Sequence, residues 1–210
     1  MLTKSQAGLL FKILRQAYPD AKPELNFNSA FELMIAVMLS AQCTDKRVNI
    51  VTGELFKKYN TPKDFAEIKR DELERLIYSC GFYKNKAKNI IAASRMILTE
   101  YNGQVPDKLE ELVKLDGVGR KTANVIYSVY FKGDAIAVDT HVFRLSKRLG
   151  LSSGNSPLQV EKDLMNIIDK DKWSLFHHLL IYHGRNVCKS AKPNCVECCL
   201  KNICEYNIEH

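Results

Sequence analysis

The sequence predicts an all-α fold, and three observations lead to this prediction. Apolar residues recur at helical spacing through most of the 210 residues, beginning with Leu9, Leu10 and Ile13. Strand-like alternation between turn residues is nearly absent, and residues 136–138 are the one short candidate. Gly and Pro, which interrupt helices, number only 10 and 6.

The expected helices follow one another along the chain. The first lies around residues 7–14, and the second opens after Ser29, whose side chain can cap free helix amides. This second helix is apolar nearly all round, so we expect it at the centre of the fold. Thr61 before Pro62 signals the start of a later helix. The other helices are expected at residues 45–59, 63–69, 71–79, 84–101, 107–115, 120–131, 139–149, 156–169 and 173–184.

Composition is that of a folded chain without a membrane span. Hydrophobic residues make up 46% and charged residues 26%, and the length fits one large domain or two small ones. The longest apolar run, residues 33–39, is far shorter than the roughly 18 residues that a membrane helix needs. The short apolar stretch at the N-terminus is broken by Lys12 and is followed by no small-residue cleavage site, so we expect a cytosolic protein.

The charge balance favours an anionic partner without selecting one. Lys and Arg number 31 against 24 Asp and Glu, which leaves +7 with His neutral. Many soluble proteins are equally basic, so nucleic-acid binding needs further support from motifs.

A short turn between two helices is the most informative stretch. Within residues 109–131, Gly117 and Gly119 flank Val118, and two glycines there allow positive φ and a close backbone approach to a ligand. The amides of these three residues precede a helix N-terminus, where free N–H groups and the helix dipole favour a phosphate. Val118 is expected to pack between the two helices. The alternative is an ordinary helix-turn-helix connection with convenient glycines.

Two residues after this turn carry potential chemistry. Lys121 lies in the first turn of the following helix, beside Arg120. The Arg120 cation and the helix N-terminus both disfavour the ammonium form of Lys121 and so favour a nucleophilic amine. A solvated phosphate contact is the alternative role. Asp139 follows an apolar run and begins another helix, where an N-cap is the alternative role. The two roles of Asp139 are compatible, because a carboxylate fixed at a helix start is rigidly aimed.

The cysteines point to a metal centre. Of the seven cysteines, Cys43 and Cys80 are isolated and five fall within the last 23 residues. The pattern C-x6-C-x2-C-x5-C uses Cys188, Cys195, Cys198 and Cys204. Cys199 is left spare, because adjacent cysteines cannot readily ligate the same compact site. Such a set suits an iron–sulfur cluster or zinc, with unliganded thiols as a third alternative and a disulfide framework the least favoured.

With LDGVGRKTA, VDTHV and this cysteine pattern in order, the sequence resembles the helix-hairpin-helix DNA glycosylase/AP lyase family that carries a 4Fe-4S cluster. The resemblance covers nearly the whole chain and includes LSAQCTD at 39–45, GFYKNKA at 81–87 and HGR at 183–185. It implies two helical domains flanking a DNA-binding groove. One domain would span residues 24–134 with the hairpin, and the other would combine residues 1–23 and 135–210, with a 4Fe-4S cluster on the four cysteines.

The resemblance also implies a function in base excision repair. The protein would be a bifunctional DNA glycosylase and AP lyase, acting as a monomer on double-stranded DNA with oxidised pyrimidines or abasic sites, in the cytoplasm at the nucleoid. Lys121 would attack the sugar C1′ of a nucleotide flipped out of the duplex, and Asp139 would stabilise positive charge and assist proton transfers. The residues implied to contact DNA are Gln42, Phe82, Gly117, Val118, Gly119, Arg120 and His141. Among them, Gln42 and Phe82 would fill the gap left in the duplex.

Some positions depart from the family pattern. Asp116 stands where the family commonly has Pro, and Phe82 stands where bacterial members often carry Leu. Cys43 and Cys199 receive no role beyond that of small hydrophobic residues. A related mismatch or adenine glycosylase and a noncatalytic iron–sulfur DNA-binding module are the alternative functions. The related glycosylases typically lack a lysine at position 121, and a module that only binds DNA or senses redox state requires neither Lys121 nor Asp139.

Overall fold

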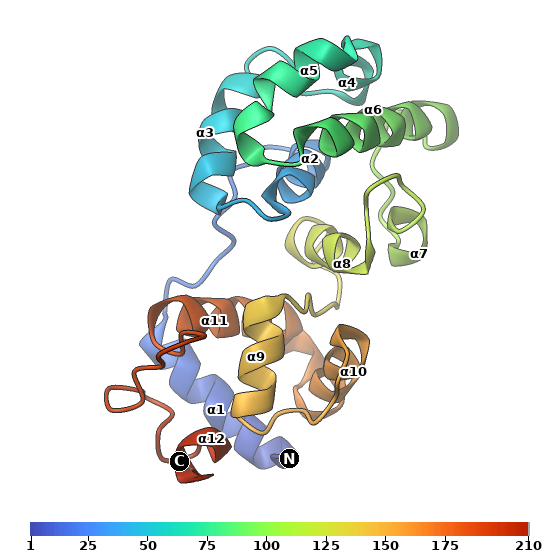
Figure 1. Ribbon diagram of the computed structural model, residues 1–210. Helices are drawn as coiled ribbons and strands as arrows, with labels where there is room; N and C mark the ends of the chain where they lie inside the picture. Colours follow the sequence, from blue (N-terminus) through green and yellow to red (C-terminus); the bar gives the residue numbers. More distant parts are fainter. Residues whose placement is uncertain (210) are drawn as a thin grey trace. The chain divides into compact units, whose positions relative to one another are not determined.

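The computed structural model describes residues 1–209, and every regular element within them is a helix (Figure 1). The prediction of an all-α fold is therefore confirmed. Residues 136–138 were the strand candidate, and this expectation is wrong: they form a buried, non-helical segment without a strand partner among the described residues. None of the helices in this part of the chain combines the length and apolar character needed to cross a bilayer.

The chain divides into two compact units. Glu24–Gly133 form one unit, here called the hairpin unit, and Met1–Pro23 with Asp134–His210 form the other, here called the cysteine unit. Each unit has its own buried apolar cluster.

The hairpin unit is built around one fully apolar helix. Its helices are α2 (Ala30–Ser40), α3 (Asp45–Leu55), α4 (Pro62–Glu67), α5 (Arg70–Leu76), α6 (Tyr83–Glu100), α7 (Leu109–Leu112) and α8 (Arg120–Val129), with a 3₁₀ turn η1 (Tyr78–Cys80) before α6. In α2 every residue from Phe31 to Leu39 is buried, which confirms the expected central position. Ser29 caps α2 by accepting from the Glu32 amide, and Thr61 forms a capping box at the start of α4.

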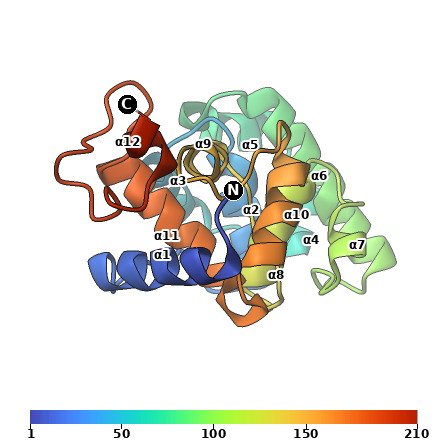
Figure 2. The same ribbon diagram turned by 90° about the horizontal axis from the view of Figure 1, so that it is seen from below.

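The cysteine unit brings together the two ends of the chain. Its helices are α1 (Lys4–Ala17), α9 (Thr140–Arg148), α10 (Pro157–Ile167), α11 (Trp173–Asn186) and α12 (Glu205–Glu209), with a 3₁₀ turn η2 (Lys170–Lys172) before α11. α1 packs against α11 and α10, as Figure 2 shows from below, and α9 packs against α11. The terminal amine of Met1 lies 3.4 Å from the Glu205 carboxylate. Between α11 and α12 the chain forms an irregular segment, here called the cysteine loop (residues 187–204).

The helix expected at residues 107–115 is much shorter in the structure. α7 has only four residues, and after it the Lys114 and Leu115 amides donate to carbonyls three residues back, at 3.1 and 3.2 Å, as in tight turns. Tight turns then carry the chain past Leu115 to the hairpin glycines, so that Leu112 and Leu115 are both buried.

Candidate functional site

The hairpin turn between α7 and α8 needs glycine at one of its two glycine positions. Gly117 has φ +75°, and a Cβ there would lie 2.8 Å from the Asn89 Cβ and 2.9 Å from the Met38 Cε. Gly119 has φ −76° and ψ 172°, which is the extended conformation of a helix N-cap, and open space surrounds the position of its Cβ. Of the two glycines, Gly117 uses the positive φ that glycine allows, and Gly119 does not.

The amides of the hairpin differ in their availability. The Val118 amide donates to the Leu115 carbonyl at 3.0 Å, so the expectation that all three amides face a ligand is wrong for Val118. The Val118 side chain is 3% exposed and packs in the core of the hairpin unit, as expected. Because Gly119 brings no capping side chain, the first-turn amides of α8 have no side-chain cap from the N-cap residue. An uncapped, exposed helix start of this kind suits an anion.

Lys121 lies directly behind this helix start. It is the second residue of α8, and both Lys121 and Arg120 are exposed. The amphipathic α8 buries Ala123 and Ile126 on its other face, which keeps the first turn of the helix at the surface. The Lys121 amine is therefore accessible from solvent.

Gln42 and Phe82 occupy two loops of the same unit, and both have left-handed backbones. Their φ angles are +54° and +46°. Gln42 follows α2 and is exposed, while Phe82 is the N-cap of α6 and is 63% exposed. Few non-glycine residues adopt such a conformation, and aromatic side chains rarely lie so open to solvent. Both side chains are available to a partner outside the protein.

Asp139 is held rigidly at the start of α9 in the cysteine unit. Its Oδ1 accepts a hydrogen bond from the Val142 amide at 2.8 Å, so Asp139 is the N-cap of this helix. Its side chain is half-buried. The capping role is thus real, and it fixes the direction of the carboxylate. Lys121 and Asp139 belong to different units.

The helix that Asp139 begins is tied to the end of α11. The Arg144 Nη2 lies 3.2 Å from the His141 Nδ1 and donates to the carbonyls of Gly184 and Cys188 at 3.1 and 2.9 Å. Gly184 permits this approach, because a Cβ there would lie 2.9 Å from the His141 Nδ1. The glycine of the HGR motif therefore serves close packing between α9 and α11.

Two histidines, His141 and His178, interact electrostatically with the Asp139 carboxylate. Burial lowers the pKa of His178 to about 4, while Asp139 raises it and Arg185 lowers it further. Burial also lowers the pKa of His141, which again senses Asp139, Arg144 and Arg185. Burial therefore favours the uncharged form of both imidazoles. Sequence reasoning missed His178, which has no local signal, and Arg185, which the HGR motif marks.

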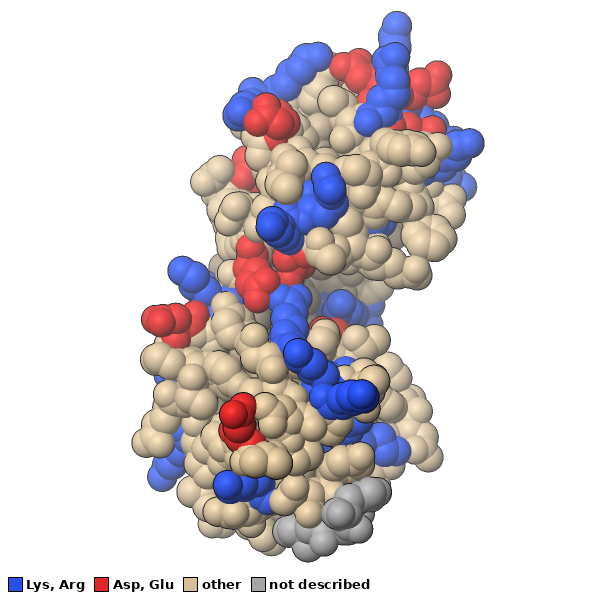
Figure 3. All heavy atoms as spheres, turned by 60° about the vertical axis from the view of Figure 1, so that its left-hand side comes forward, with Lys and Arg blue, Asp and Glu red and all other residues tan. Residues whose placement is uncertain are grey.

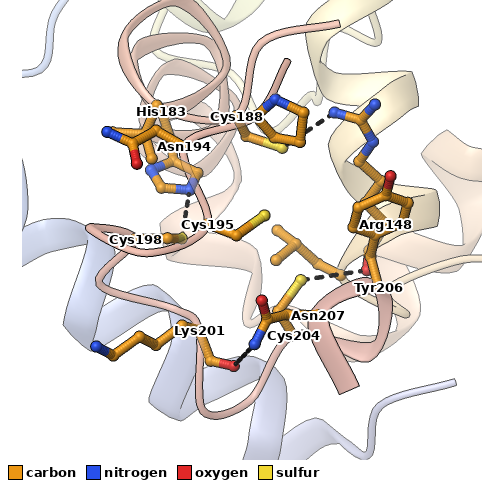
Figure 4. A pocket seen from close by; sticks show the side chains of 13 residues that line it. Arg148, His183, Cys188, Asn194, Cys195, Cys198, Lys201, Cys204, Tyr206 and Asn207 are labelled. Carbon is orange, nitrogen blue, oxygen red and sulfur yellow. Dashed lines mark hydrogen bonds between the residues drawn. The ribbon is translucent and has the colours of Figure 1, made fainter. Parts of the chain in front are cut away.

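The four spaced cysteines line one cavity (Figure 4). It holds about 330 Å³ of empty space, partly open to solvent, and its lining includes Cys188, Cys195, Cys198 and Cys204. Cys199 is exposed and is not among the lining residues. Among the side chains that the structure describes, no three from His, Cys, Asp or Glu lie close enough together to hold one metal ion. The four thiols therefore surround a space rather than converge on a point.

Arg148 and His183, both missed by sequence reasoning, support this cavity. Arg148 donates to the carbonyls of Lys189 and Ser190 at 2.8 Å each, approaches the Cys188 sulfur at 3.4 Å, and lies over the Tyr206 ring. The His183 Nε2 lies 3.4 Å from the Cys198 sulfur, and its Nδ1 lies 2.9 Å from the Tyr18 hydroxyl. No sequence signal pointed to Arg148, whereas His183 belongs to the HGR motif.

The cavity environment disfavours ionised thiols unless a cation accompanies them. Burial raises the pKa of the Cys198 thiol to about 11 and also raises that of Cys204. Thiolates are the form that binds metal, and a metal cation supplies the compensating charge.

Surface charge is distributed rather than concentrated on the face seen in Figure 3. Lys and Arg side chains are spread over this face with Asp and Glu side chains among them.

Comparison with known proteins gives consistent matches. The family model described as HhH-GPD superfamily base excision DNA repair protein matches residues 35–170. Endonuclease III of Bacillus subtilis (strain 168) is 50% identical over 205 residues, covering 97% of this chain and 94% of that protein. Endonuclease III of Rickettsia prowazekii (strain Madrid E) is 48% identical over 200 residues, covering 95% and 94%. A solved structure of a trapped endonuclease III–DNA covalent intermediate, an estranged-adenine complex, has a TM-score of 0.95 and 50% identity, covering 100% of this chain and 99% of that one.

The family match includes the hairpin, Lys121 and Asp139, and it ends before the cysteine loop. It spans more than half of the chain, and relatives of near 50% identity match almost from end to end. The family resemblance inferred from the motifs is confirmed. The chain belongs to the HhH-GPD superfamily of base excision DNA repair proteins.

Proposed function

We propose that this protein is a base-excision DNA glycosylase with AP lyase activity, of the endonuclease III type. Its substrate would be double-stranded DNA with oxidised pyrimidines or abasic sites, and it would act as a monomer at the nucleoid in the cytoplasm. The observation that carries the proposal is Lys121, an exposed amine directly behind the hairpin helix start. The covalent DNA intermediate trapped with a protein of 50% identity supports a nucleophilic mechanism.

In the proposed reaction Lys121 is the nucleophile. The damaged nucleotide leaves the base stack, because its glycosidic bond is inaccessible inside a duplex. The Lys121 Nζ bonds to the sugar C1′, the glycosidic bond breaks, and the base departs with its electron pair and is then protonated. Opening of the sugar ring leaves an imine between Nζ and C1′. Removal of a C2′ proton then breaks the C3′–O bond, which cuts the strand on the 3′ side.

Asp139 would act on the charges and protons of this reaction. One of its oxygens is held by the Val142 amide at 2.8 Å, so the carboxylate has a defined direction. Burial favours the uncharged form of the two imidazoles that interact with it, so they would not compete as cations for the carboxylate when positive charge develops on the sugar. We assign to Asp139 this stabilisation and a share of the proton transfers.

The proposed DNA contacts divide into phosphate contacts and gap-filling contacts. Gly117, Gly119 and Arg120 at the start of α8 would hold a phosphate, which positions the protein without reading sequence. Val118 would contribute through packing rather than its amide, which is already bonded. Gln42 would bond to the orphan base and Phe82 would act as an apolar wedge. We assign His141 to the neighbourhood of the catalytic carboxylate, where it contacts Arg144.

We further propose that residues 24–134 form the hairpin domain, and that residues 1–23 with 135–210 form a domain with a 4Fe-4S cluster. Cys188, Cys195, Cys198 and Cys204 would hold the cluster. Four thiols on one cavity are the donor set that an iron–sulfur cluster takes, and they would bind it as thiolates. These thiols surround a cavity and do not form a compact metal site. When bound, the cluster would cross-link the cysteine loop.

Borohydride reduction tests the nucleophile. Reduction during reaction with a thymine-glycol or abasic duplex should trap a covalent adduct, and Lys121→Gln should abolish trapping while DNA binding persists. Lys114→Gln is the matched control, because Lys114 is an exposed lysine of the same unit that pairs with Glu111. Adduct formation by the Lys121→Gln variant would refute the assignment.

Metal analysis tests the cofactor. The purified protein should be brown and contain about four iron atoms per chain. Cys198→Ser should lower the iron content, whereas Cys199→Ser should not, because Cys199 lies outside the cavity lining. Zinc in place of iron would contradict the cluster assignment. A panel of lesion duplexes, including mismatched adenine, would then separate this activity from that of a related mismatch or adenine glycosylase.

A further inference from the structure

Two turns of the hairpin unit hold large side chains where glycine is preferred. Residues 40–43 form a β-turn closed by the Cys43 amide and the Ser40 carbonyl at 3.0 Å. Ala41 has φ −57° and ψ 113°, and Gln42 has φ +54°, which is the type II geometry with Gln42 at the position that favours Gly or Asn. Phe82 takes the left-handed N-cap of α6, a position where Ser, Thr, Asp or Asn is usual. Such outliers point to a functional demand on the two side chains.

One buried lysine lies behind both turns. Lys86 belongs to the first part of α6 and is 8% exposed. Its Nζ donates to the carbonyls of Leu39 and Ala41 at 2.7 Å and to the carbonyl of Cys80 at 2.8 Å. An ammonium group has three N–H donors, so all of its protons are engaged. Burial lowers the pKa of Lys86, and the three carbonyls compensate for its lost hydration.

These three carbonyls determine how the two turns are built. Type I and type II turns differ by a flip of the central peptide, and the Ala41 carbonyl belongs to that peptide. With the carbonyl held by Lys86, the peptide keeps the type II orientation and Gln42 keeps its positive φ. The Cys80 carbonyl belongs to the peptide before Gly81, which has φ +68° and ψ 156°, a region open essentially to glycine alone.

Other contacts join the two turns at the same place. The Lys86 amide donates to the Phe82 carbonyl at 3.1 Å, so the residue that binds both turns is also bonded to the N-cap of α6. The Cys80 thiol, whose pKa burial raises to about 11, also interacts with the Cys43 thiol next to Gln42. The Leu39 carbonyl lies in the last turn of α2, where the helix dipole favours a cation.

We propose that Lys86 is a positioning residue that fixes the backbones of Gln42 and Phe82 together, so that both side chains are ready to enter a damaged duplex. The proposal rests on the proposed gap-filling function of these two residues. A fixed arrangement loses less conformational freedom when the gap is filled. Lys86 therefore favours binding to DNA that opens easily at a lesion over binding to intact DNA.

The test is the discrimination ratio, defined as the affinity for a duplex with a tetrahydrofuran abasic analogue divided by the affinity for the undamaged duplex. Fluorescence anisotropy measures both affinities with the whole protein. Lys86→Met keeps the chain length and removes the three donors. We expect it to lower the ratio about tenfold, equivalent to about 1.4 kcal/mol. The affinity for undamaged DNA should stay within about twofold, because phosphate contacts elsewhere are retained.

A second background shows whether Lys86 acts through the two side chains. In the Gln42→Ala, Phe82→Ala double variant, adding Lys86→Met should lower the ratio no further. If the double variant itself keeps the ratio of the unmodified protein, the proposed gap-filling function is wrong. If the double variant loses the ratio but Lys86→Met alone does not, the gap-filling function stands and the inference about Lys86 is wrong.

Two further variants separate positioning from loss of fold. Gly81→Ala strains only the local backbone, since no atom lies within 4 Å of the new Cβ, and it should lower the ratio as Lys86→Met does. Ile97→Ala destabilises the same unit from its buried core and should leave the ratio unchanged. If Lys86→Met fails to fold, Gly81→Ala decides: an unchanged ratio overturns the proposal. An equal loss of ratio in Ile97→Ala would also overturn it.

Discussion

Alanine substitutions at Gly117 and Gly119 should separate the fold of the hairpin from its contact with DNA. Gly117→Ala places a Cβ at φ +75° and 2.8 Å from the rigid Asn89 Cβ. The backbone strain costs about 1–3 kcal/mol and the overpacking about 1–3 kcal/mol. Because the Met38 side chain can move aside, we expect a total loss of about 2–5 kcal/mol in the free energy of unfolding. That is a large part of a typical total of about 5–15 kcal/mol.

Gly119→Ala is the matched control, two residues away in the same turn. The φ of Gly119 is −76°, and a Cβ there would meet open space. The only expected cost is that Ala is a poorer N-cap than Gly, which lowers the free energy of unfolding by about 1 kcal/mol or less. The new methyl group would nevertheless lie beside the helix start where a phosphate is proposed to bind. We therefore expect Gly119→Ala to weaken DNA binding with little loss of stability, and Gly117→Ala to reduce both.

Urea unfolding followed by circular dichroism measures the first quantity, and fluorescence anisotropy with an undamaged duplex measures the second. A Gly117→Ala protein within about 0.5 kcal/mol of the unmodified protein would refute the steric reasoning, since that is the range of neutral surface substitutions. A Gly119→Ala protein with unchanged DNA affinity would refute phosphate binding at the start of α8.

Three further predictions concern the cysteine unit. Burial lowers the pKa of His178 from 6.5 to about 4. Between these two values His178 is protonated in the unfolded chain and neutral in the folded chain. The free energy of unfolding should therefore fall by up to about 3 kcal/mol as the pH is lowered to 4, and His178→Leu should lack this fall. Equal pH dependence of the free energy of unfolding in the two proteins would contradict this. Arg148→Met removes two hydrogen bonds of 2.8 Å to the cysteine loop, worth about 1 kcal/mol each, and should speed limited proteolysis there; unchanged cleavage would count against that role. Gly184→Ala adds a Cβ 2.9 Å from the His141 Nδ1. The overpacking costs about 1–3 kcal/mol, which should exceed the gain of about 1 kcal/mol from the higher helix propensity of Ala. A variant that is more stable in thermal unfolding would disprove the close-packing argument.

Most helices were predictable because their signals are local. Apolar spacing located the buried α2, and cap residues such as Ser29 and Thr61 marked helix starts that the structure confirms. The errors occur where packing overrides periodicity. The helix pattern at residues 107–115 yields only the four residues of α7, because the hairpin turn must begin early enough to bury Leu115 and Val118.

The candidate site was predictable only in part, for a related reason. The position of Lys121 in a first helix turn and that of Asp139 at a helix start follow from neighbouring residues, and the structure contains both. The left-handed backbones of Gln42 and Phe82 had no such signal. Their conformation depends on Lys86, which lies 45 residues from Ala41 in the sequence. Arg148 likewise reaches carbonyls 41 and 42 residues away.

The sequence by itself determined the helical class, the family and the residue types available for chemistry, because periodicity, caps and motif spacing involve residues within a few helical turns of one another. Only the tertiary structure decided that four thiols line one cavity, that two histidines with lowered pKa values interact with Asp139, and that one buried ammonium holds two turns. These features depend on distances between segments remote in the chain. Such distances are set by how helices pack, and local sequence patterns do not specify them.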